Sequence, residues 1–126
     1  MKNIILEFDK RVISKEEMLE HIEYYSSKSD EAMKLHSSGK VKEAREIFKD
    51  LRSKLKLEYK YYDKVSVRKY LYKDKYYNTY ANGVAQAYVK QIRPNSNDML
   101  FSNLHDIHDY ISNYEMRIFL KNNSYY

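Results

Sequence analysis

Residues 39–62 read GKVKEAREIFKDLRSKLKLEYKYY, and this stretch decides the fold class. From Val41 onward, apolar side chains recur at steps of three and four residues, which places them on one side of a helix. These positions are Ala44, Phe48, Leu51, Leu55 and Tyr59 or Tyr62. Gly39 stands just before them, where glycine can end a preceding helix in the left-handed conformation. The stretch therefore predicts a turn followed by an amphipathic helix.

A helix is also predicted upstream of this turn. Ser14 and Glu17 have the spacing of a capping box, in which each side chain accepts a backbone N–H of the first helical turn. The apolar residues that follow keep helical spacing, with Ser29 as a small polar interruption. They are Met18, Ile22, Tyr25, Ala32 and Met33. We expect this helix to end near Gly39.

Downstream, a third helix is expected before Pro94. Val41 to Ile92 contain no proline and a single glycine, Gly83, so one rod of about 50 residues is the alternative. We favour a break at residues 63–66, because Asp63 can cap a new helix and so long a rod would need a partner. The apolar stripe of the third helix is expected to be Val67, Leu71, Tyr77, Ala81, Val84 and Tyr88.

A fourth helix is expected from residues 96–98 onward, with an apolar stripe again at helical spacing. The stripe consists of Leu100, Leu104, Ile107, Ile111, Tyr114 and Ile118. Short connections force neighbouring helices to be antiparallel. The sequence thus predicts a single all-α domain over residues 1–126, a bundle of about four antiparallel helices with an arm at 1–13 and a frayed tail at 122–126.

Composition supports the all-α class and narrows the kinds of site and the cellular location to be expected. Two glycines and one proline are too few for the tight turns of a β-sandwich or barrel. Cysteine is absent, so disulfides, thiolate metal sites and cysteine nucleophiles are excluded. No apolar run approaches the roughly 20 residues that span a bilayer. We expect a cytoplasmic protein without membrane association, and its oligomeric state stays open.

The helical hairpin at about residues 30–55 resembles a known family locally. The segment carries Gly39, Ala44, Phe48 and Leu51. In these four positions it resembles a tetratricopeptide-type hairpin, a family in which a glycine closes the turn, a small residue lets the helices approach and an aromatic residue fills the gap. The 34-residue repeat of that family does not recur, so the alternative is a packing solution shared by many helical hairpins.

Positive charge is concentrated in residues 52–75. This segment holds nine basic side chains against three acidic ones, a net charge of +6, whereas the other 102 residues hold 14 basic and 15 acidic side chains. Eight of the 15 tyrosines occupy or adjoin the segment. Because tyrosine contributes large contact area at interfaces for little rotamer entropy, this combination indicates a binding surface. The alternative is an ordinary solvated face enriched in lysine and tyrosine by composition.

The candidate binding residues are Lys54, Lys60, Lys64, Arg68, Lys69, Tyr72, Lys73, Tyr76 and Tyr80. Tyr72, Tyr76 and Tyr80 align at four-residue steps on one helical face. Such a surface predicts a protein or ribonucleoprotein partner with an acidic surface, which the chain would scaffold or inhibit. Anti-CRISPR proteins are one group of inhibitors with this size and no catalytic residues, although no motif identifies that group here.

Two other functions remain open. The same residues could contact phosphates and stack on bases, which would make the chain an RNA or single-stranded DNA binder, although arginine is scarce. His105 and His108 share a helix face and could hold a metal, or serve an enzyme, if His21, His36 or a carboxylate joined them. Neither a glycine-rich phosphate loop nor an activated serine is present. We therefore expect a non-enzymatic protein without a cofactor.

Overall fold

The computed structural model describes residues 14–64, 75–91 and 99–112, which form helices and no strand. The elements are α1 (Lys15–Ser37), α2 (Val41–Tyr62), α4 (Lys75–Ala85), the π-helical segment η1 (Gln86–Gln91) and α5 (Leu100–Ile111). The predicted all-α class is confirmed. The expected arm at 1–13 and tail at 122–126 lie outside the described residues. None of the described helices is long and apolar enough to cross a membrane.

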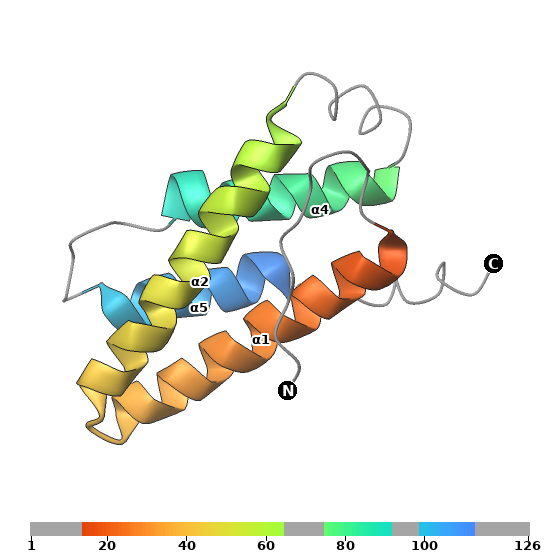
Figure 1. The fold of residues 1–126 in the computed structure, drawn as a ribbon. Coiled ribbons are helices and arrows are strands. Elements are labelled where there is room, and N and C mark those ends of the chain that lie inside the picture. Colours follow the sequence, from red (N-terminus) through yellow and green to blue (C-terminus); the bar gives the residue numbers. More distant parts are fainter. Residues whose placement is uncertain (1–13, 65–74, 92–98, 113–126) are drawn as a thin grey trace.

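The helices form a bundle in which α2 runs back along α1 and α5 runs back along α4, while α4 crosses α2 at a steep angle (Figure 1). Helices α1 and α2 make a hairpin, and α1 packs extensively against both α2 and α5. Helix α4 and η1 pack against both α2 and α5, whereas the diagonal pairs α1–α4 and α2–α5 touch only lightly. The described helices therefore form a four-helix arrangement in which α1 lies on one side between α2 and α5, and α4 with η1 lies on the other.

Both ends of α1 follow the signals in the sequence. The Glu17 amide donates to Ser14 Oγ at 3.1 Å, and the Ser14 amide donates to Glu17 Oε1 at 3.1 Å, so the capping box is confirmed. At the other end, Gly39 has φ +86°, the left-handed conformation that glycine adopts most readily. The Lys40 amide donates to the Leu35 carbonyl at 2.8 Å and closes the turn before α2 begins.

The predicted break after the second helix is confirmed; whether Asp63 caps a new helix depends on residues 65–74, which lie outside the described residues. Helix α2 ends at Tyr62, and the Asp63 amide donates to the Tyr59 carbonyl at 3.0 Å. Asp63 therefore closes α2 in the structure. Helix α4 then runs back across α2, which excludes one continuous rod (Figure 1).

The apolar stripes of α1, α2 and α5 form most of the core. Met33 and Phe48 are half-buried; the other described stripe residues of these helices are buried, apart from half-buried Tyr59. The fully buried ones include Met18, Ile22, Tyr25, Ala32, Ala44, Leu51, Leu55, Leu104, Ile107 and Ile111. Expected core positions at Val67, Leu71, Tyr114 and Ile118 lie outside the described residues, and the Tyr77 side chain is not described.

The buried face of α4 and η1 differs from the predicted one. Val84 is buried as expected, but Ala81 and Tyr88 are only half-buried, and Tyr80 and Ala87 are buried instead. The difference has a physical cause, because the Tyr80 hydroxyl finds a buried acceptor in the core. The sequence also gave no sign that the helix continues as the π-helical segment η1 after Ala85.

Candidate interaction surface and buried polar cluster

One side of α2 faces solvent and is rich in lysine. At 100° per residue, the exposed positions from Lys49 onward fall within a sector of about 100°, apart from Asp50 at its edge, and this sector lies opposite the buried Leu51, Leu55 and Glu58. We call this sector the lysine face. It consists of Lys49, Ser53, Lys56, Leu57, Lys60 and, just past the helix end, Lys64.

The charges of the lysine face are mostly unneutralised. Lys49 pairs with Glu46 at 3.7 Å between Nζ and Oε1. Lys56, Lys60 and Lys64 make no ion pair with the described part of the chain. Leu57 stands beside them with 53% of its surface exposed. An acidic surface with an apolar patch could cover Leu57 and contact the ammonium groups around it.

Lys54 does not belong to this face, because its side chain contacts α1, and its part in binding stays a prediction. Its Nζ lies 2.5 Å from Asp50 Oδ1 and 5.4 Å from the centre of the Tyr24 ring. The Tyr24 hydroxyl donates to Asp50 Oδ2 at 2.8 Å, so the three side chains join α2 to α1. With its side chain only 17% exposed, Lys54 is committed to this contact.

The pKa of Asp50 reflects the same contact. Partial burial acts to raise this pKa, but hydrogen bonds from Lys54 and Tyr24 outweigh burial and hold it below its ordinary value of 3.8. Burial and the neighbouring Asp50 carboxylate raise the pKa of Tyr24 far above its ordinary range. Asp50 is therefore ionised and Tyr24 neutral at physiological pH, as the contact requires.

The predicted tyrosine face is wrong at Tyr80. This side chain is fully buried, and its hydroxyl donates to Glu58 Oε2 at 2.9 Å. It therefore cannot stack on a partner while α4 is docked. Tyr76 is part of α4, but its side chain is not described. The remaining candidates, Arg68, Lys69, Tyr72 and Lys73, lie outside the described residues and stay predictions.

A buried polar cluster surrounds Glu58, which is completely inaccessible to solvent. Tyr25 donates to its Oε1 at 2.6 Å, and Tyr80 and Tyr62 donate to its Oε2 at 2.9 and 3.5 Å. The Nδ1 of His21 lies 2.9 Å from Oε1. We call these five side chains the Glu58 cluster.

The cluster keeps its tyrosines neutral. Burial, and then the charge of Glu58, raises the pKa of both Tyr25 and Tyr80 well above their ordinary value of 10.0. Ring contacts add to the hydrogen bonds, since Tyr62 meets Tyr80 edge to face with centroids 5.8 Å apart. The cluster thus combines hydrogen-bonded polar groups with packed aromatic rings.

From the sequence, Glu58 was only one of the three acidic residues of residues 52–75, and the cluster was not predicted. One signal was available, because Glu58 follows Leu51 and Leu55 at steps of seven and three residues and so lies on the apolar stripe of α2. His21 likewise follows Met18 by three residues on α1. A charged residue on an apolar stripe predicts either a rotated helix or a buried polar network, and spacing alone does not choose between them.

A groove of about 300 Å³ lies between α2 and α4, beside the lysine face. Alanines at Ala81 and Ala85 leave space opposite the tyrosines of α2, while polar side chains form the rest of its wall. The groove is lined by Tyr59, Tyr62, Asp63, Asn78, Ala81, Asn82 and Ala85. Tyr62 belongs both to this groove and to the Glu58 cluster, so the two features share a wall.

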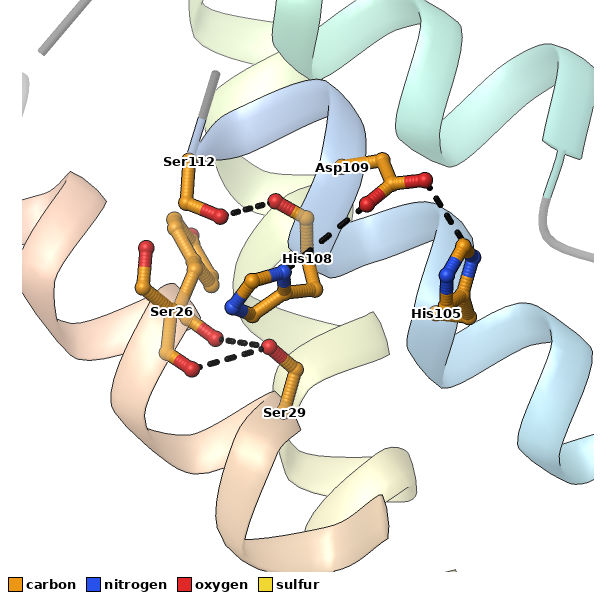
Figure 2. Close-up of polar contacts among 7 residues, drawn as sticks. Ser26, Ser29, His105, His108, Asp109 and Ser112 are labelled. Atoms are coloured by element: carbon orange, nitrogen blue, oxygen red, sulfur yellow. Dashed lines mark hydrogen bonds and ion pairs between the residues drawn. The ribbon is translucent and has the colours of Figure 1, made fainter. Parts of the chain in front are cut away.

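The histidine pair of α5 is arranged around one carboxylate. The Nδ1 atoms of His105 and His108 lie 3.2 and 3.8 Å from the two oxygens of Asp109. Figure 2 shows that carboxylate between the two rings, with His108 on the side toward Ser26 and Ser29 of α1. Within residues 14–64, 75–91 and 99–112, no group of three or more potential ligands is placed to hold a metal ion. Neither His21, which contacts Glu58, nor His36, which packs against Phe101, joins the pair.

Comparison with known proteins adds no relative. No protein-family model matches the chain, and no curated protein or solved structure is similar to it. The resemblance of residues 30–55 to a tetratricopeptide-type hairpin therefore stays a prediction.

Proposed function

We propose that this chain is a non-enzymatic interaction protein that binds a protein or ribonucleoprotein partner with an acidic surface. Binding occurs through the lysine face of α2 and scaffolds or inhibits the partner. The observation that carries the proposal is the run of exposed Lys56, Lys60 and Lys64 around the exposed Leu57, since these lysines make no ion pair within residues 14–64, 75–91 and 99–112. Charges without internal partners are available to an acidic surface and accelerate its association.

Leu57 favours a protein surface over a bare nucleic acid. A leucine exposed over half of its surface gains free energy only when an apolar group covers it, and interface cores between proteins provide such groups. Phosphate recognition would use the lysines and leave Leu57 in water. Direct RNA or single-stranded DNA binding remains the second candidate, supported by the same unpaired ammonium groups.

The test is a charge reversal with a matched control. The variant Lys56→Glu, Lys60→Glu reverses two charges of the lysine face, and Lys34→Glu, Lys40→Glu reverses two exposed charges elsewhere. Surface changes of this kind alter stability by less than about 0.5 kcal/mol each, so both variants should fold. Each is used to capture partners from a lysate of the source cell at about 0.15 M salt, before and after nuclease treatment.

We expect the lysine-face variant to lose a captured protein that the parent chain and the control variant retain. Retention of that protein after nuclease treatment supports a protein interface. Loss after nuclease treatment, together with binding of a purified oligonucleotide, supports the second candidate. Equal capture by both variants contradicts the lysine face as the binding surface.

A further inference from the structure

Arg52 stacks on a tyrosine where α2 meets η1. Its guanidinium carbon lies 5.9 Å from the centroid of the Tyr88 ring, within the range of a cation–π contact. The Tyr88 ring in turn packs against Tyr59, with centroids 5.6 Å apart and an interplanar angle of 34°. Because the ring supports the planar guanidinium, Arg52 is held in place more firmly than a fully exposed arginine. We call these three side chains the arginine stack.

The charge of Arg52 has no counter-ion among the described residues. None of their carboxylates forms an ion pair with it, and its Nε atom is enclosed by protein without a hydrogen-bond partner. Since Nε is closed off and the side chain is half-buried, a ligand can reach the guanidinium only through its two Nη groups. Two parallel N–H donors at the end of a guanidinium match the two oxygens of one carboxylate.

The arginine stack borders the lysine face. Lys56 follows Arg52 by four residues on α2, so the two cationic side chains are neighbours on the helix surface. Val89, which follows Tyr88 in η1, has 52% of its surface exposed. Tyr88 itself belongs to a π-helical segment, a rare geometry that occurs frequently at functional sites. The junction of α2 and η1 therefore presents an oriented arginine, an exposed lysine and an exposed apolar side chain.

We infer that the arginine stack is the position at which the proposed interface binds a side-chain carboxylate of its protein partner. This rests on the proposed function and adds to it the residue that selects the carboxylate, Arg52, and the residue that positions it, Tyr88. Arginine and tyrosine are among the residue types that most often anchor protein interfaces. A single-stranded nucleic acid needs an open aromatic face for its bases, whereas the Tyr88 ring is covered by Arg52 and packs against Tyr59. The stack is therefore suited to a carboxylate rather than to a base.

Binding of a defined acidic peptide by the full chain tests the stack. The probe is an acetylated hexaglutamate peptide, titrated into the isotope-labelled chain at low salt and followed by NMR. Arg52→Lys keeps the charge but removes the planar pair of donors, and Arg45→Lys makes the same change at a half-buried arginine of α2 outside the stack. We expect Arg52→Lys to bind the peptide at least about tenfold more weakly, the factor for losing one hydrogen bond to a charged group. Arg45→Lys should bind it as the parent chain does.

Two variants of Tyr88 separate the orientation of Arg52 from its charge. Tyr88→Leu removes the ring beneath the guanidinium and should also weaken binding of the peptide, although the charge of Arg52 is unchanged. Tyr88→Phe keeps the ring and should restore most of the affinity. Circular dichroism of each variant shows that the helices are intact.

The outcomes distinguish the stack from the lysine face. If Lys56→Glu, Lys60→Glu loses the captured partner while Arg52→Lys retains both partner and peptide, the proposed function stands and the arginine stack is overturned. If Arg52→Lys loses the peptide while the reversed lysine face still binds the partner, the carboxylate site stands and the proposed function fails. A parent chain that does not bind the peptide would overturn the stack. Binding of an oligothymidylate of equal charge that is as tight as that of the peptide, and equally dependent on Arg52, would overturn the assignment to a carboxylate.

Discussion

At the scale of single residues, tyrosines carry two different tasks that the sequence does not separate. Tyr25, Tyr62 and Tyr80 turn their hydroxyl groups inward to one carboxylate. Tyr59 packs its ring 5.6 Å from that of Tyr88 at the edge of the bundle. Helical spacing placed Tyr25 and Tyr62 on predicted core stripes, but it placed Tyr80 on the predicted binding face. The buried acceptor is what assigns all three of them to the core.

The buried tyrosines predict an alkaline transition. Because the pKa of Tyr25 and Tyr80 is raised in the folded chain, folding favours their neutral form. Their contribution to stability is fully present below the unfolded value of about 10 and is lost as the pH rises above it. We expect these tyrosines to ionise only as the protein unfolds, measured by tyrosinate absorbance alongside circular dichroism.

Phenylalanine variants identify the residues concerned. Tyr25→Phe or Tyr80→Phe should each remove one hydroxyl from the group that ionises on unfolding. Tyr110→Phe is the matched control, because Tyr110 is exposed and lies outside the Glu58 cluster. If all tyrosines ionised with ordinary pKa values in a chain that stayed helical, the cluster would not be closed to solvent.

At the scale of helices, whether a buried face could be predicted depended on the types of residue that form it. The stripes of α2 and α5 could be predicted because leucine and isoleucine occupy their core positions. Helix α4 could not, since its core contact is a tyrosine whose burial depends on Glu58 of another helix. The lysine face was predicted in part, with Lys60 and Lys64 exposed and Lys54 drawn into a contact with α1. Such cross-helix partners have no periodicity along the chain.

The turn between α1 and α2 gives a second prediction. A Cβ added at Gly39 would meet nothing within 4 Å, so any cost of substitution comes from the backbone. With φ at +86°, alanine should destabilise the fold by about 1–2 kcal/mol. Asparagine tolerates the left-handed region better, and Gly39→Asn should cost clearly less. Urea denaturation of both variants measures the difference; equal costs would mean that φ is not the cause.

At the scale of the whole molecule, two surfaces of α2 serve opposite purposes. On its buried side, the carboxyl group of Glu58 accepts hydrogen bonds from Tyr25 of α1 and Tyr80 of α4. Its exposed side presents lysine side chains to solvent. The net charge of +5 comes from the segment that includes the end of this helix. Helix α2 thus contributes both to the core of the fold and to the proposed interface.

The lysine face and Leu57 should affect different steps of partner binding. Steering by Lys56 and Lys60 acts on the encounter, so reversing both charges should slow association by about tenfold or more and flatten its salt dependence. Leu57 acts after contact, through apolar area that salt screens little. Leu57→Ser should therefore accelerate dissociation at about 0.15 M salt while the salt dependence of association stays that of the parent chain. Surface plasmon resonance with the captured partner measures both rates. A Leu57→Ser variant that dissociates at the parent rate would remove the apolar part of the interface and leave a solely electrostatic contact, which is the behaviour of a polyanion binder.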